Sequence, residues 1–431
     1  MSAIPTEPLP RASFGSRRGW LVLGVAFLVM SAGFALRNAF SVFYPAIVDD
    51  FGWSRGSAAI MFSLSILVYG LLSPLAGSLV DKTKPHVVVA IGVTLLAGCV
   101  ALCSLATEEW HFYVLYGVIG AVGVAMMGIT TLAATVMPWF PRRRALAFAI
   151  LAAGFGVSLV AAALVEYLIS AFGWQLALVY SGVAVIMVVV PLVVIFLRRP
   201  SARHPAPDAP VAVSSQSSHD SVARPATGWH SNDWTLRRAL KTPQFWMLWV
   251  AGFCQLGLAE KMTIAHQVYF FRDAGYTPLA AASIYSVFGV IFVIGSLASS
   301  LSDRIGRERA YLPACGIAIA GALLLFSVED ATQPWMAYLF AVMFGFGMGM
   351  MPPILFAAVA DLFHGKSYGA IQGMVALGFS AGGALSPWLA GHIHDITGSY
   401  YQTLFILMGA LVTCGLLMWL AAPRRLSPVR G

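Results

Sequence analysis

Twelve long apolar runs constrain this chain more than any other feature of its sequence. A helix that crosses a bilayer core needs about 20 apolar residues. Charged residues make up only 10% of the chain, whereas a soluble domain carries about 25%. The sequence therefore predicts an all-α membrane protein with 12 transmembrane helices. We expect the spans near 20–47, 57–80, 86–106, 111–137, 145–169, 175–197, 243–271, 279–302, 310–328, 334–362, 367–393 and 401–422.

A polar stretch at 198–242 divides the apolar sequence into two halves. It is rich in Pro, Ser and Ala, and it holds too few apolar side chains to offset the entropy of ordering it. We therefore expect an N-terminal six-helix lobe at 1–197, a cytoplasmic linker at 198–242 and a C-terminal six-helix lobe at 243–431.

The two halves contain similar segments in the same order. Residues 75–82 read LAGSLVDK and residues 297–304 read LASSLSDR, which are identical at five of eight positions. Ser54 and Thr277 occupy matching places and are suitable N-caps for the helices that follow them. The pattern predicts two parallel six-helix repeats related by an axis along the membrane normal.

The basic residues define an orientation. With the N-terminus inside, all Lys and Arg residues except four fall in cytoplasmic segments. Arg55 and Arg272 lie outside, and Arg37 and Lys261 lie within spans. Because cytoplasmic loops carry the excess of Lys and Arg, we expect both termini in the cytoplasm of a multi-pass plasma-membrane protein, with the bacterial inner membrane as the expected location.

Two loop motifs follow the second helix of each half. Residues 77–84 (GSLVDKTK) keep the Gly, Asp and basic positions of a motif found in the major facilitator superfamily, although Pro85 departs from its later basic pair. Residues 303–307 (DRIGR) are closer to the full pattern. Together with the repeat and the central linker, these segments resemble that superfamily along the whole chain.

Three further segments resemble one branch of the superfamily, the monocarboxylate transporters and oxalate/formate antiporters. They are 139–154, which reads WFPRRRALAFAILAAG, the exit of the first helix at 50–55, and 369–373. The resemblance implies secondary transport of small organic anions, coupled to a proton or to exchange. One departure matters: carriers of this branch commonly place Asp and Arg in helix eight, and residues 279–302 contain no charge.

Two basic residues at matched depth are the candidate binding groups for a carboxylate. Arg37 lies deep in the first span and Lys261 lies deep in the seventh, its repeat equivalent. A buried charge is costly unless it is paired or faces a wet cavity. Arg can hold a carboxylate through a bidentate fork, whereas Lys acts as a point charge. Ser41 and Tyr44 share the helical face of Arg37 and are the further substrate-binding candidates. The alternative is that the cations pair with structural acids.

Two titratable residues near Lys261 are candidates for proton coupling. Glu260 is a buried carboxylate that could neutralise a cation or carry a proton, and His266 lies further towards the outside. A structural ion pair and a hydrogen-bonded helix histidine are the respective alternatives.

The superfamily resemblance implies a cytoplasmic gate between the lobes. Acids that end helices at this face latch the lobes to basic groups and helix N-termini. The candidate gating residues are Asp81, Arg142, Arg143, Asp303 and Arg304.

The sequence thus predicts a monomeric secondary active transporter that moves small monocarboxylates by alternating access. The expected partners are the organic anion, a proton and membrane lipid. The alternative is an exporter of drugs or other metabolites on the same fold. We expect no enzymatic activity, cofactor or metal, because no nucleophile–base arrangement or metal-ligand spacing is evident. We also expect no nucleic-acid partner, because the positions of the basic residues account for the net charge of +8.

Overall fold

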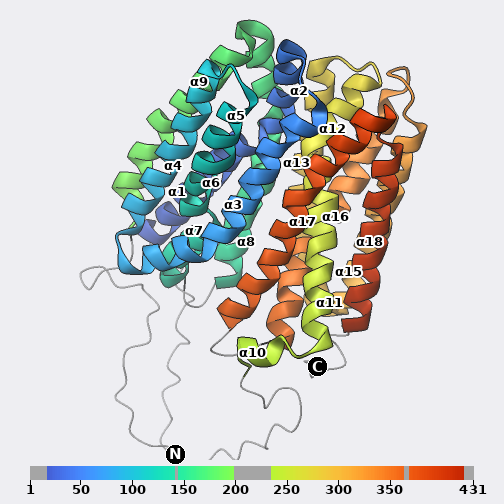
Figure 1. The fold of residues 1–431 in the computed structure, drawn as a ribbon. Helices are drawn as coiled ribbons and strands as arrows, with labels where there is room; N and C mark the ends of the chain where they lie inside the picture. The colour runs from blue at the N-terminus through green and yellow to red at the C-terminus, as the bar shows by residue number, and fades with distance from the viewer. Residues whose placement is uncertain (1–16, 141–143, 199–233, 364–367, 422–431) are drawn as a thin grey trace, which may run out of the picture.

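The computed structural model describes residues 17–140, 144–198, 234–363 and 368–421, and these residues form helices without a single strand. Two helical bundles lie side by side, one blue to green and one yellow to red (Figure 1). This arrangement confirms the predicted all-α membrane class.

The N-terminal lobe contains the helices up to residue 196. They are α1 (Arg17–Asn38), α2 (Phe40–Phe51), α3 (Arg55–Lys82), α4 (Pro85–Leu102), η1 (Cys103–Leu105), α5 (Glu109–Phe112), η2 (Tyr113–Gly120), α6 (Ala121–Met127), α7 (Ile129–Val136), η3 (Met137–Trp139), α8 (Arg144–Val160) and α9 (Ala162–Phe196).

The C-terminal lobe contains the helices from residue 236 onwards. They are α10 (Leu236–Ala239), α11 (Pro243–Gly252), η5 (Phe253–Glu260), α12 (Lys261–Asp273), α13 (Pro278–Ala298), η6 (Ser299–Leu301), α14 (Ser302–Ile305), α15 (Arg307–Leu324), η7 (Leu325–Ser327), α16 (Pro334–Leu362), α17 (Tyr368–Thr397) and α18 (Tyr401–Ala421).

The described residues contain 10 helical segments that are long and apolar enough to cross a membrane. The longest, Ala147–Phe196, is divided by Gly173, whose φ of 79° is non-helical. The residues before Gly173 continue the span that begins with α8, and those after it form a separate pass. The run from α11 through η5 to α12 supplies a further pass that contains Glu260 and Lys261. The arrangement is consistent with the predicted 12 spans.

Local sequence signals set several helix boundaries. Ser54 and Thr277 cap α3 and α13, since their hydroxyls accept hydrogen bonds from the backbone N–H groups of Ser57 and Ala280. Both predicted caps are therefore confirmed. Helix α17 extends to Thr397, beyond the predicted end at 393, because the polar residues of its last turn take part in contacts between the lobes.

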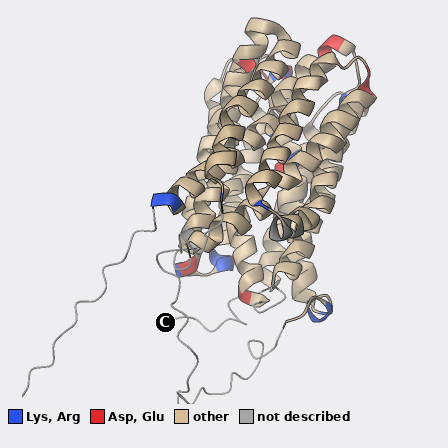
Figure 2. Ribbon diagram, turned by 90° about the vertical axis from the view of Figure 1, so that its left-hand side faces the viewer, with Lys and Arg blue, Asp and Glu red and all other residues tan. Residues whose placement is uncertain are grey.

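The lobes meet mainly through four helix pairs: α3 with α17, α8 with α13, α9 with α13, and α2 with α12. Small residues allow the close approach of α3 and α17. A Cβ added to Gly70 would lie 2.2 Å from Oγ of Ser380. Most of the blue ribbon of Lys and Arg lies at the end of the bundles that carries α10 (Figure 2). The charge pattern of the sequence predicts that this end faces the cytoplasm.

Candidate functional site

Arg37 lies in the last turn of α1 and is 5% exposed. Its Cζ lies 4.9 Å from the ring centroid of Tyr69, 5.8 Å from that of Phe62 and 5.9 Å from that of Phe34. Nε and Nη2 have no hydrogen-bond partner among the described residues. The guanidinium is thus held by aromatic faces, which attract a cation, while two of its nitrogens keep their hydrogen-bonding capacity.

Glu260 and Lys261 form a buried ion pair in the seventh span. Nζ of Lys261 lies 2.5 Å from Oε1 of Glu260, and their side chains are 9% and 2% exposed. The second carboxylate oxygen, Oε2, has no hydrogen-bond partner among the described residues. The pair stands where the π-helical segment η5 ends and α12 begins. Such wide helical turns are rare and often occur at functional sites.

The backbone around this turn is held against α17. A Cβ added to Gly257 would lie 2.7 Å from Cα of Gly382, and Oγ of Ser386 donates a 2.8 Å hydrogen bond to the carbonyl of Gly257. Only glycine permits this approach of the two backbones. The contact fixes the position of Glu260 and Lys261 relative to α17.

A pair of phenylalanine rings connects Arg37 with Lys261. The rings of Phe34 and Phe155 pack edge to face with centroids 5.6 Å apart. Arg37 lies against Phe34, and Nζ of Lys261 lies 4.7 Å from the centroid of Phe155. Phe155 belongs to the N-terminal lobe, so this contact crosses between the lobes. The two cations are therefore brought to opposite ends of one aromatic pair.

Tyrosines surround the same region. The hydroxyl of Tyr116 donates a 2.5 Å hydrogen bond to the carbonyl of Arg37. The buried hydroxyl of Tyr285 has no hydrogen-bond partner among the described residues. Tyr285 stands in α13, the helix in which the sequence shows no charge. The sequence did not predict the three tyrosines near the site, Tyr69, Tyr116 and Tyr285. A tyrosine in an apolar run carries no sign that it faces a polar site.

Ser41 and Tyr44 lie in α2, between Arg37 and the end of the bundle that is predicted to face outside. The hydroxyl of Ser41 donates to the carbonyl of Ile264, which joins the first and seventh spans across the lobes. The hydroxyl of Tyr44 donates to the carbonyl of Arg55, and its ring packs edge-on against His266 and Tyr269. The structure thus places Ser41 near the candidate site and Tyr44 in the contact between the outer ends of the lobes.

His266 is buried with both ring nitrogens in hydrogen-bonding contact. Nε2 lies 2.7 Å from the carbonyl oxygen of Pro387, and Nδ1 lies 3.0 Å from the hydroxyl of Tyr400. A carbonyl oxygen only accepts, so the proton of the neutral ring belongs on Nε2 and Nδ1 accepts from Tyr400. Nη1 of Arg55 in turn donates to the Tyr400 hydroxyl at 3.1 Å. His266 therefore belongs to a chain of hydrogen bonds that reaches Arg55.

Arg55 is the centre of an ionic contact between the lobes. Its Nη1 and Nη2 pair with Oδ2 and Oδ1 of Asp273 at 2.5 and 2.8 Å, and its guanidinium lies 4.0 Å from the ring centroid of Tyr269. Asp395 accepts hydrogen bonds from the backbone N–H groups of Arg55 and Gly56 at the start of α3. A second pair joins Arg272 to Asp49 at 2.8 Å. These pairs hold the lobes together at the end predicted to face outside.

The predicted gating residues are only partly covered by the structure. Arg142, Arg143 and the side chain of Asp81 lie outside the described residues. Asp303 accepts a 2.5 Å hydrogen bond from Nη1 of Arg307, and Nε of Arg307 also bonds to Asp361 on α16. Arg304 is exposed. Among the residues that the structure describes, the contacts of Asp303 therefore stay within the C-terminal lobe.

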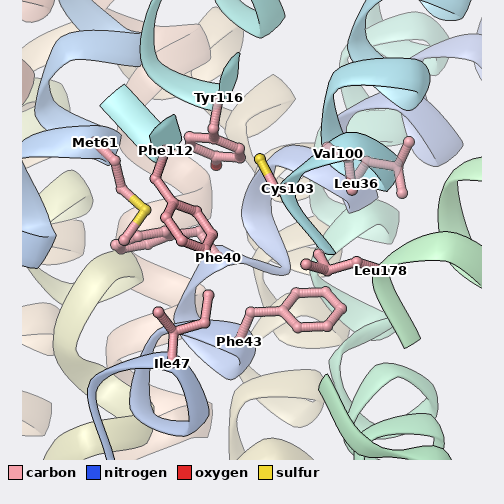
Figure 3. A pocket seen from close by; sticks show the side chains of 10 residues that line it. All are labelled: Leu36, Phe40, Phe43, Ile47, Met61, Val100, Cys103, Phe112, Tyr116 and Leu178. Carbon is pink, nitrogen blue, oxygen red and sulfur yellow. The ribbon is translucent and has the colours of Figure 1, made fainter. Parts of the chain in front are cut away.

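A small cavity lies within the N-terminal lobe (Figure 3). It has a volume of about 20 Å³, and apolar and aromatic side chains such as Leu36, Phe40 and Phe112 line it. Tyr116 and Cys103 are also labelled around it. A volume of this size holds about one water molecule, so the cavity is too small and too apolar for an organic anion. The charged groups at the lobe interface remain the candidate site.

The sequence profile of the Major Facilitator Superfamily matches residues 21–369 and 301–430. The chain belongs to this superfamily. The finding agrees with the parallel bundles and with buried charges at their interface. Superfamily members are transporters and not enzymes, as the sequence analysis expects.

Among curated relatives of this superfamily member, monocarboxylate transporter 13 of Rattus norvegicus is 27% identical over 401 residues, covering 92% of this chain and 87% of the relative. Monocarboxylate transporter 2 of Homo sapiens is 25% identical, and the alignment covers 95% of this chain and 86% of the relative. These matches relate the chain to the monocarboxylate transporters.

Solved structures agree on the fold. A bacterial homologue of the human lysosomal transporter Spinster, in an inward-facing and occupied conformation, superimposes with a TM-score of 0.69. The alignment covers 95% of this chain and 98% of the other at 15% identity. At that identity the likeness concerns the fold alone.

Proposed function

We propose that this protein is a secondary active transporter of small monocarboxylates and that Arg37 binds the carboxylate. The supporting observation is the buried guanidinium, whose Nε and Nη2 lack hydrogen-bond partners among the described residues. An unpaired buried cation is costly. A carboxylate that accepts from both nitrogens would relieve this cost through a bidentate, charge-assisted contact.

The charges at the site favour an anion with one carboxylate. Lys261 is neutralised by Glu260 at 2.5 Å, whereas Arg37 has no acidic partner among the described residues. One carboxylate therefore balances the remaining positive charge. A cationic solute would add a second uncompensated charge, which argues against an exporter of cationic drugs.

Glu260 is the proposed proton carrier. Its protonation would release Lys261 from the ion pair and leave this cation free to engage the substrate beside Arg37. His266 is a weaker candidate, since both ring nitrogens already have partners in the contact between the lobes. We assign His266 to the outer contact and proton coupling to Glu260.

Alternating access would proceed by rocking of the two lobes. In the arrangement seen here, Arg55 and Asp273 join the lobes at the outer end, which corresponds to a state closed to the outside. Opening to the outside would require these pairs to break, and Ser41 would lose its contact with Ile264.

Uptake into proteoliposomes tests this function. Radiolabelled acetate, lactate and pyruvate would be compared with their neutral amides, with an inward proton gradient and with a trans-loaded carboxylate. The proposal expects saturable uptake of at least one acid and no uptake of its amide. Transport of amides and acids alike would contradict it, as would transport limited to organic cations.

A further inference from the structure

A groove of about 340 Å³ lies over α17, between α3 of the N-terminal lobe and α11 of the C-terminal lobe. Helix α17 runs between these two helices in Figure 1 and packs against both. The lining includes Leu67 and Leu71 from α3, Trp246 and Trp249 from α11, and Met374 and Ala381 from α17. Both lobes thus contribute to one apolar groove.

The positions of neighbouring residues on α3 show that this groove lies on the exposed surface of the bundle. Gly70 contacts α17 through Ser380, and the preceding residue, Tyr69, lies against Arg37. Successive residues on a helix are 100° apart, so Leu71 lies on the side of α3 opposite to Tyr69. Leu67 and Leu71 are 39% and 58% exposed. The leucines therefore face away from the charged site.

Helix α17 shows the same division. A Cβ on Gly383 would lie 3.1 Å from Cγ of Lys261, which places Gly383 on the side of the charged site. Ala381 is two residues away, about 200° around the helix, and is exposed. The groove and the charged site thus lie on different sides of α17.

A basic turn lies at one end of the groove. Nε1 of Trp246 donates a 2.9 Å hydrogen bond to the carbonyl of Leu240, which ties the groove wall to the turn after α10. Arg237 and Lys241 on either side of Leu240 are exposed. Figure 1 shows α10 at the lower end of the bundle, below and to the left of α11. The charge pattern predicts that this end faces the cytoplasm, where the leaflet carries anionic lipids.

We infer that the groove binds an anionic phospholipid of the cytoplasmic leaflet. One acyl chain lies against Leu67, Leu71 and Trp249, and the headgroup phosphate lies at Arg237 and Lys241. Trp246 stands between these two parts, where an amphipathic indole suits the boundary of the bilayer. Because the groove walls come from both lobes, the bound lipid favours the arrangement of lobes seen here.

Quenching by brominated lipids tests this inference directly. The full-length transporter would be reconstituted in phosphatidylcholine that contains phosphatidylglycerol with brominated acyl chains. The tryptophan fluorescence of the Trp246→Phe/Trp249→Phe variant would be subtracted from that of wild type. The difference is the fluorescence of the two tryptophans that line the groove. We expect brominated phosphatidylglycerol to quench this signal more strongly than brominated phosphatidylcholine does. Each basic residue near an anionic surface contributes about fivefold in affinity, so Arg237→Gln and Lys241→Gln should each lower the preference by about that factor.

Two controls match these variants. Arg17→Gln/Arg309→Gln removes the same charge from exposed positions elsewhere and should leave the preference unchanged. Ala381→Phe should reduce groove quenching by either lipid, whereas Ala184→Phe, at an exposed position on α9, should not. If the Arg237→Gln/Lys241→Gln variant keeps the wild-type preference for phosphatidylglycerol, the inference is overturned. Displacement of the brominated phospholipid by a free fatty acid would also overturn it, because the groove would then bind a fatty acid and not a phospholipid.

Discussion

Nζ of Lys261 lies 2.5 Å from Oε1 of Glu260, its neighbour in sequence. Adjacent residues on a regular helix point about 100° apart, and here the pair stands at the end of the π-helical segment η5. The pair neutralises one of the two buried cations and leaves Arg37 as the charge available to a substrate. The proposed division of roles, with Arg37 for binding and Glu260 for coupling, follows from this contact.

The first prediction concerns the stability of this pair. Lys261→Met leaves the buried Glu260 carboxylate unpaired and should destabilise the protein by about 3–5 kcal/mol. The double variant Glu260→Gln/Lys261→Met removes both charges and should recover most of this loss. Thermal melting of the purified protein in detergent compares the variants. Equal melting temperatures for Lys261→Met and the double variant would show that the pair is not coupled.

The second prediction separates the two candidates for proton coupling. Glu260→Gln should abolish accumulation driven by a pH gradient while exchange of labelled for unlabelled carboxylate continues, because the amide cannot release a proton. His266→Gln should keep the pH dependence of uptake. The two variants would be compared in proteoliposomes at several external pH values. A pH dependence lost in His266→Gln and kept in Glu260→Gln would reverse the assignment.

The third prediction concerns the contact between the outer ends of the lobes. Arg55→Gln removes a charged hydrogen-bond partner of Asp273, which costs about 1.5–3 kcal/mol, so the outward-open population should rise about tenfold or more. Gln267→Cys, at a buried position, would report this opening through a membrane-impermeant maleimide added outside. The five native cysteines are buried and would be replaced first.

Arg272→Gln is the matched control for this experiment. It also breaks an interlobe pair, but its partner Asp49 is 56% exposed, against 38% for Asp273. Exposed pairs contribute about 1 kcal/mol or less, so labelling should rise less than in Arg55→Gln. Equal labelling in wild type and Arg55→Gln would remove Arg55 from the gate.

The buried charges, and the pairing of Glu260 with a cation, were predictable from the sequence, whereas the aromatic contacts of Arg37 and Lys261 were not. Arg37, Glu260 and Lys261 are conspicuous because charges are rare in apolar spans. The aromatic contact through Phe34 and Phe155 depends on how two lobes pack, and no periodicity in the sequence encodes it. The same holds for Arg55 and Asp273, which are 218 positions apart. The sequence predicts that Arg55 lies outside the membrane, but it carries no sign that Arg55 meets Asp273.

Helix positions were predicted well, because bilayer thickness sets a length that apolar runs must meet. The end of α17 was missed for a physical reason. His394 and Asp395 interrupt the apolar run, yet Asp395 accepts hydrogen bonds from the start of α3. The opposite lobe thus stabilises a polar helical turn that the sequence alone would place in a loop.

The binding affinity of Arg37 variants tests the central claim most directly. Arg37→Lys keeps the charge and loses the fork, and Arg37→Ala loses both. Loss of a charged hydrogen-bond partner costs about 1.5–3 kcal/mol, or roughly tenfold to a hundredfold in affinity. Equilibrium binding of a labelled monocarboxylate to the purified protein should therefore weaken in the order wild type, Lys, Ala, while the weak binding of the neutral amide stays unchanged. Melting temperatures would be recorded in parallel to identify loss of folded protein. If folded Arg37→Ala binds the carboxylate as tightly as wild type, Arg37 is not the carboxylate site. The same holds if the substitution lowers the affinities for the acid and for the amide by the same factor.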